Sequence, residues 1–157
     1  GRLEVKVMKL TGEVLNSYKR NVKVDANSSK ALFSVPLDEV LKGARKEDVF
    51  IHAVLLTDKG NSNYTNNYFL VKQKEVNYPK AQLATSVQPI EGGFEVTLSS
   101  DNFARAVFIA TGDANSSFSD NYFDILPGSS VKVEVYTDLP LATFEKQLKV
   151  MSLSDEY

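Results

Sequence analysis

Apolar and polar residues alternate with a period of two along much of this sequence, and this alternation limits the possible folds more than any other feature. Because successive side chains of a strand point to opposite faces of a sheet, the pattern predicts half-buried strands. Turn-forming residues separate these segments, so we predict an all-β fold of the sandwich type. The alternating positions are Leu3, Val5 and Val7; Val22 and Val24; Phe94, Val96 and Leu98; Val131, Val133 and Val135; and Leu148 and Val150, with turns at residues 11–13, 25–27, 58–61, 91–93 and 126–129.

Four segments depart from simple alternation. Residues 49–56 and 104–110 are more continuously apolar, which predicts central strands that are covered on both faces. Residues 36–43 have proline near the start, acids in the first turn and glycine at the end, which predicts a short helix. Residues 138–144 are expected to form an irregular connection, because Pro140 is unsuited to a central strand.

The 157-residue chain contains the same order of features twice. A buried strand, a polar loop and the tripeptide Asn-Tyr-Phe occur within residues 49–69 and again within residues 105–123. In such a motif a short amide side chain can close the loop onto its own backbone, and the aromatic pair can seal the rim of a sandwich. We therefore predict two closely packed β-sandwich modules, residues 1–78 and 79–157.

The composition excludes several classes of function. The chain has no cysteine, which excludes disulfides, thiolate metal ligands and cysteine nucleophiles. The single histidine, His52, cannot form a two-histidine zinc site, so we expect a structural role for it. The net charge is −2 and the lysines are scattered, which argues against a nucleic-acid partner. We also expect no membrane insertion and no cofactor, since long apolar runs and nucleotide-binding motifs are absent from the sequence.

Two acidic clusters are candidates for chemistry. Asp120 and Asp124 would project from one face of an extended strand, as a general acid and base could. Both lie beside turns, where acids usually bond to the local backbone, so we favour a structural role. Residues 113–117 imitate the first ligands of a calcium loop, but Phe118 stands where such a loop needs glycine. We therefore predict neither a catalytic residue nor a metal site.

Three tyrosines are candidate glycan contacts. Tyr64, Tyr68 and Tyr122 lie around the two polar loops, where exposed aromatic rings could stack on sugars. The chain has no tryptophan, which is the commonest residue of such platforms. The sequence leaves two interpretations open, glycan contact and packing at the rim of a sandwich, and favours rim packing.

Residues 119–129 have the sequence Ser-Asp-Asn-Tyr-Phe-Asp-Ile-Leu-Pro-Gly-Ser. This segment and the strand-like residues 131–135 resemble the C-terminal immunoglobulin-like module of family 2 glycoside hydrolases of the β-mannosidase type. Residues 48–55 and 66–72 are similar to the preceding module of those enzymes, and residues 148–154 are similar to their closing strand. The resemblance implies two immunoglobulin-like β-sandwich modules in tandem, and leaves open whether the first module lacks its opening strand.

The resemblance also implies a function. Such enzymes remove β-linked mannose with retention, using two glutamates on a (β/α)₈ barrel, and neither glutamate can be assigned to this chain. We therefore expect a non-catalytic accessory region that braces the catalytic barrel, with β-mannosides as a second possible partner. By analogy, the setting is bacterial and periplasmic or extracellular. Two alternatives are a carbohydrate-binding β-sandwich module and a cell-surface interaction domain.

Overall fold

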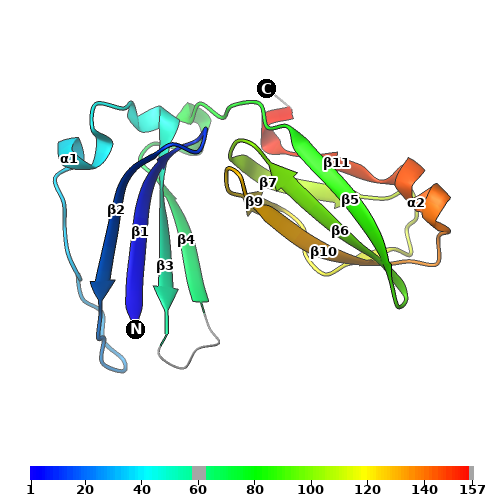
Figure 1. The fold of residues 1–157 in the computed structure, drawn as a ribbon, viewed down its shortest axis with the longest axis horizontal. Coiled ribbons are helices and arrows are strands. Elements are labelled where there is room, and N and C mark those ends of the chain that lie inside the picture. The colour runs from blue at the N-terminus through cyan, green and yellow to red at the C-terminus, as the bar shows by residue number, and fades with distance from the viewer. Residues whose placement is uncertain (58–62, 156–157) are drawn as a thin grey trace. The chain divides into compact units, whose positions relative to one another are not determined.

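The computed structural model describes residues 1–57 and 63–155, and most of its regular structure is antiparallel β-sheet (Figure 1). The chain divides into two compact units, Gly1–Asn77 (unit 1) and Tyr78–Tyr157 (unit 2). The predicted all-β fold class is confirmed. The turn predicted at residues 58–61 lies outside the described residues.

The described part of unit 1 contains one antiparallel sheet of four strands, in the order β2-β1-β3-β4 (Figure 1). Its strands are β1 (Arg2–Lys9), β2 (Val14–Asn21), β3 (Val49–Leu56) and β4 (Asn63–Phe69). The short helix α1 (Leu37–Leu41) and the 3-10 turn η1 (Lys46–Asp48) connect β2 to β3, and η2 (Gln73–Glu75) follows β4. Helix α1 confirms the helix predicted within residues 36–43.

The two faces of the unit 1 sheet differ in chemistry, and directly paired residues of antiparallel strands show which side chains share a face. Val5 pairs with Tyr18 on β2 and with Ala53 on β3, so these three lie together. By the same pairing, one face, called the apolar face below, consists of Leu3, Val5, Val7, Tyr18, Ile51, Ala53, Leu55, Tyr64, Asn66 and Tyr68, together with Asn16 and Arg20 on β2.

Unit 2 contains two sheets that share one hydrophobic core (Figure 1). The first has the order β5-β6-β10-β8 and the second the order β11-β7-β9. Core residues from both sheets are fully buried, as in a sandwich, for example Val96 and Val133 from the first and Val107 and Ile109 from the second. The strands are β5 (Leu83–Ile90), β6 (Gly93–Ser100), β7 (Ala104–Ala110), β8 (Ser117–Phe118), β9 (Phe123–Ile125), β10 (Ser130–Tyr136) and β11 (Lys149–Met151).

A helix in unit 2 corrects one prediction. Residues 138–144 were expected to be irregular, but α2 (Leu141–Gln147) begins within them, and the 3-10 turn η3 (Leu153–Asp155) follows β11. Pro140 is the N-cap of α2, a site where its fixed φ and missing N–H cost little. The helix buries Phe144 completely, and this ring stacks on Phe94 with 4.4 Å between the centroids. Pro140 therefore marks the start of a helix that packs on the core.

Two strand predictions also need correction. Val22 and Val24 follow β2 in an irregular segment, whereas the preceding residues 14–21 form the strand. Strand β3 lies between β1 and β4, in the interior of its sheet as predicted, but it is less completely covered than expected. Only Val49 and Phe50 are buried in β3, and its other six residues are partly exposed. The same holds for β7, where Phe108 and Ala110 are partly exposed.

Candidate interaction surfaces

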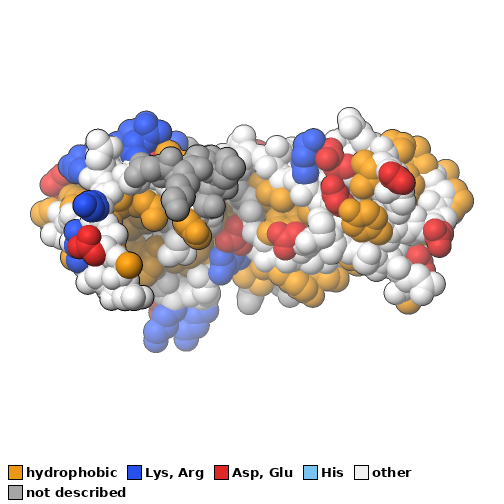
Figure 2. All heavy atoms as spheres, turned by 90° about the horizontal axis from the view of Figure 1, so that it is seen from below, with side chains coloured by type: hydrophobic (Ala, Val, Ile, Leu, Met, Phe, Trp, Pro, Cys, Tyr) orange, Lys and Arg blue, Asp and Glu red, His pale blue; other side chains and the backbone are white. Residues whose placement is uncertain are grey.

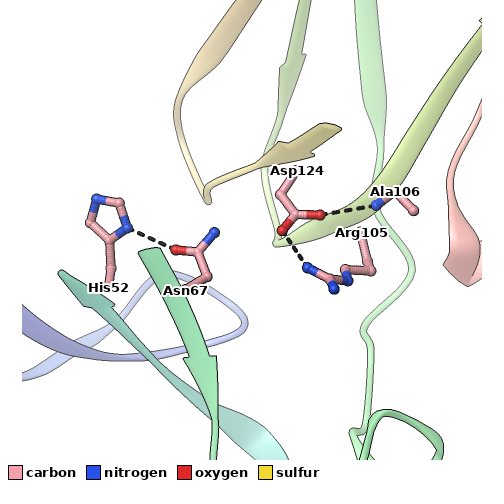
Figure 3. Close-up of polar contacts among 5 residues, drawn as sticks. All are labelled: His52, Asn67, Arg105, Ala106 and Asp124. Carbon is pink, nitrogen blue, oxygen red and sulfur yellow. Dashed lines mark hydrogen bonds and ion pairs between the residues drawn. The ribbon is translucent and has the colours of Figure 1, made fainter. Parts of the chain in front are cut away.

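The two carboxylates considered for acid and base chemistry bind neighbouring groups of unit 2. Asp120 Oδ1 accepts a hydrogen bond from the Asn121 N–H at 2.8 Å. Asp124 Oδ2 forms an ion pair with Arg105 Nη1 at 2.5 Å, and its Oδ1 accepts the Ala106 N–H at 3.1 Å (Figure 3). These contacts support the structural interpretation of both residues.

Asp124 lies beside a β-bulge and a strained residue. The pairing of β7 with β9 shifts between Ala104 and Val107, and Ala106 within the bulge has a φ of 48°. This left-handed conformation is unfavourable for alanine, whose Cβ approaches the backbone. The carboxylate of Asp124 therefore holds the backbone N–H of a strained residue.

The nearby Tyr78 has a raised hydroxyl pKa, and burial is the main cause. The positive charge of Arg105 opposes that rise, and the negative charge of Asp124 adds to it.

Asp113, the first residue of the calcium-like segment, is likewise bound by local groups. Its Oδ1 accepts the Asn115 N–H at 3.1 Å, and its Oδ2 accepts the hydroxyl groups of Ser116 and Thr137 at 3.2 and 3.3 Å. Within residues 1–57 and 63–155, no group of three or more His, Asp or Glu side chains is placed to hold a metal ion.

His52 bonds across the unit 1 sheet. Its Nδ1 lies 2.8 Å from Asn67 Oδ1, and the two residues are direct partners on β3 and β4 (Figure 3). This contact gives His52 a structural partner, as expected from the sequence.

Among the described residues there is no helix with the length and hydropathy needed to cross a membrane.

Tyr64 and Tyr68 lie on the apolar face of unit 1, with Asn66 between them on β4. Their exposed fractions are 63% and 60%. Hydrophobic side chains are visible at the surface of unit 1 among charged ones in Figure 2. Rim packing of these two residues therefore stays a prediction, and most of each residue is exposed.

Asn121 fixes the third tyrosine, Tyr122, at the surface of unit 2. Asn121 Oδ1 accepts the Ile109 N–H and its Nδ2 donates to the Ile109 carbonyl oxygen, both at 2.8 Å, so the side chain pairs with β7 as a strand backbone would. The same Oδ1 accepts the Tyr122 N–H at 3.1 Å. Tyr122 has a φ of 59°, and these bonds hold it in that left-handed conformation.

Tyr122 belongs to an apolar patch on the outer side of the unit 2 sandwich. Its ring stacks on Phe108 with 4.9 Å between the centroids, yet 68% of the residue is exposed. Met151, 44% exposed, pairs with Phe108 and so shares its face. We call Phe108, Tyr122 and Met151 the outer patch. The sequence signal for Phe108 was its place between the buried Val107 and Ile109, since strand neighbours point to opposite faces.

Comparisons with known proteins cover nearly the whole chain. Residues 1–75 match the family model of the mannosidase Ig/CBM-like domain, and residues 78–156 match that of a mannosidase Ig-fold domain. A solved β-D-mannosidase from Dictyoglomus thermophilum is 22% identical, with a TM-score of 0.68 over 98% of this chain. The chain spans 18% of that protein, and at this identity the likeness shows the fold alone. No curated protein matches the chain.

Proposed function

Because this chain belongs to the Ig-fold domains of mannosidases, we propose that it is a non-catalytic accessory region of a β-mannosidase-like glycoside hydrolase of family 2, and that it braces the catalytic barrel. The outer patch carries this proposal. Phe108, Tyr122 and Met151 lie outside the unit 2 core, and aromatic and methionine side chains are enriched where proteins dock. The partner would be the catalytic barrel of the retaining enzyme.

The polar side chains support a non-catalytic role. Retaining glycosidases need two carboxyl groups about 5–5.5 Å apart, one acting as nucleophile and one as acid. Asp124 is neutralised by Arg105, and Asp120 bonds to the backbone of its own turn. Asp120 and Asp124 therefore do not provide the acid and the nucleophile that the reaction needs. We expect the catalytic carboxyl groups to come from the barrel.

The test compares the parent enzyme with a variant that lacks residues 1–157. Bracing predicts that the deletion lowers the melting temperature of the barrel, while the KM for an aryl β-mannoside changes little. In the intact parent, Tyr122→Ala should reproduce part of this loss. Leu141→Ala is the matched control, because Leu141 is a 41% exposed apolar residue of unit 2 outside the outer patch. A barrel that melts at the same temperature without these residues would contradict the proposal.

A second candidate function is glycan binding, which the exposure of Tyr64, Tyr68 and Tyr122 favours. Tyrosine rings this accessible could stack on the apolar faces of sugar rings. Isothermal titration with mannose and short β-mannosides tests it directly. Saturable heat that Tyr64→Ala or Tyr68→Ala abolishes would assign the contact to unit 1, whereas loss with Tyr122→Ala would assign it to unit 2. Absence of heat would remove this candidate.

A further inference from the structure

Strand β5 is a long edge strand of unit 2 that has few of the features which usually prevent pairing at an edge. The other edge strands of this unit, β8, β9 and β11, have two or three residues, whereas β5 has eight. Short edges, charged side chains and bulges normally prevent association between sheets. Strand β5 pairs with β6 along its whole length without a bulge, and it contains no charged residue. Pro89 removes an N–H donor only near its end, so the edge from Leu83 to Gln88 can still pair.

A groove of about 480 Å³ lies along this edge, between β5 and the edge of the second sheet at β11 (Figure 1). Its apolar lining comes from Leu83 and Val87 on β5 and from Leu148 and Val150 at β11. These four side chains pack against the hydrophobic core of unit 2 and are only partly buried. Thr85, which lies between Leu83 and Val87 on the same face of β5, is exposed. The core is therefore incompletely covered along this edge.

The charges at the two ends of β5 favour one partner and one orientation. Lys80 precedes the strand, Glu91 follows it, and both residues are exposed. Antiparallel pairing of two β5 strands would bring the Lys80 end of each strand beside the Glu91 end of the other, so opposite charges would meet at both ends. Parallel pairing would instead place like charges together. The β5 edge is thus complementary in charge to a second copy of itself, and its neutral centre adds no repulsion.

We infer that a second copy of this chain binds at the β5 edge, with the two β5 strands antiparallel about a two-fold axis. The β5-β6-β10-β8 sheets of the two copies then form one continuous sheet, and backbone groups of each edge strand gain hydrogen-bond partners. The same axis places the two grooves side by side, so that Leu83, Val87 and Val150 of both copies lose contact with water. Such a contact uses one surface twice and closes as a dimer. The dimer does not depend on the proposed accessory role.

The size of this edge sets the expected affinity. Eight residues at about 3.3 Å each give a length of roughly 26 Å, and the two sheets of a sandwich lie about 10 Å apart. A contact of this size is smaller than the standard interface of about 800 Å² per partner, so the dimer should be weak. We expect a Kd of about 10–100 µM, at which the chain is monomeric in dilute solution and dimeric at high concentration.

Sedimentation equilibrium of the 157-residue chain, between about 1 µM and 1 mM, tests the inference. The average mass should rise from 17.4 kDa towards twice that value. Ser86 lies near the middle of β5, so Ser86→Lys places two like charges close to the two-fold axis and should raise the Kd about tenfold or more. Ser117→Lys is the matched control, because Ser117 is an exposed serine on β8, the other edge strand of the same sheet. It should leave the Kd unchanged.

A mixture of Ser86→Lys and Ser86→Glu chains distinguishes lost pairing from lost folding. Each variant alone should dimerise more weakly than the native chain, and the equimolar mixture should recover the dimer because opposite charges then meet near the axis. A native chain that stays monomeric at about 1 mM would overturn the inference, as would a dimer that Ser86→Lys leaves intact or a mixture that does not recover. A dimer weakened by Tyr122→Ala but not by Ser86→Lys would also overturn it, since the second copy would then lie on the outer patch.

Discussion

Removal of the Asp124 carboxylate should destabilise unit 2, because this group stabilises the bulge in β7 in two ways. One oxygen accepts the Ala106 N–H at 3.1 Å, and the other pairs with Arg105 at 2.5 Å. The side chains of Asp124 and Arg105 are 18% and 31% exposed, so water screens the pair only in part. Ala106 has the strained φ of 48°, and loss of its hydrogen bond would leave the bulge without this support.

The two contacts give a magnitude for the loss. A hydrogen bond from a backbone N–H to a charged acceptor contributes about 1.5–3 kcal/mol, and an ion pair of this exposure about 0.5–1 kcal/mol. We therefore expect Asp124→Ala to lower the free energy of unfolding of unit 2 by about 3 kcal/mol. Asp124→Asn keeps an acceptor for the Ala106 N–H, and it should cost only about 1–1.5 kcal/mol.

Urea unfolding followed by two-dimensional NMR would measure these losses, because amide signals of unit 2 can be followed separately from those of unit 1. Asp120→Ala is the control, since this carboxylate bonds to the exposed Asn121 N–H of its own turn and should change stability by less than about 1 kcal/mol. Equal losses for Asp124→Ala and Asp124→Asn would refute the role given to the Ala106 hydrogen bond. A loss below about 0.5 kcal/mol for both would refute the whole account.

Three further predictions concern side chains in special environments. Tyr18→Phe should leave stability unchanged or raise it by about 1 kcal/mol in urea unfolding, because the buried Tyr18 hydroxyl has no hydrogen-bond partner among the described residues. Asn121→Ala should cost about 2–3 kcal/mol in the same assay, since it leaves the buried N–H of Ile109 without its acceptor; an intact stability would contradict the strand-like pairing. Burial raises the pKa of Tyr78, so the folded chain keeps a proton that the unfolded chain releases above about pH 10. Stability should accordingly fall as the pH rises through that value, and urea midpoints between about pH 9 and 11 should fall less steeply in Tyr78→Phe.

The success of the strand predictions depended on how completely one side of each strand is buried. In β6 the buried residues Phe94, Val96 and Leu98 alternate with partly exposed ones, so the sequence pattern is clear. In β2, Val14 is 48% exposed and Tyr18 is the only aromatic residue, so its polar sequence gave little alternation to recognise. Tertiary pairing with β1, which the sequence pattern could not reveal, selects the strand there.

The cover of β3 could not be predicted for a different reason. A continuous apolar run indicates burial on both faces only if two layers are present, and the sequence of a strand contains no information about the second layer. In β7 the second layer covers one face, where Val107 and Ile109 are fully buried, while Phe108 between them lies on the outer side and is partly exposed. In β3 the residues after Phe50 are partly exposed. The apolar run therefore does not correspond to full cover on both faces in either strand, and packing decides how much of each face is buried.

The repeated Asn-Tyr-Phe tripeptide illustrates how far a motif can predict a site. The expected closure of a loop by the amide is met at Asn121, which bonds to the backbone of Tyr122 and of β7. Asn67 lies inside β4 instead and bonds to the His52 side chain, because regular strand pairing already satisfies the backbone around it. Both tyrosines of the repeat are exposed all the same, and each follows an asparagine whose side chain bonds to a residue of the neighbouring strand. The repeat thus places an aromatic side chain at the surface of each unit, and the local backbone decides which groups hold it there.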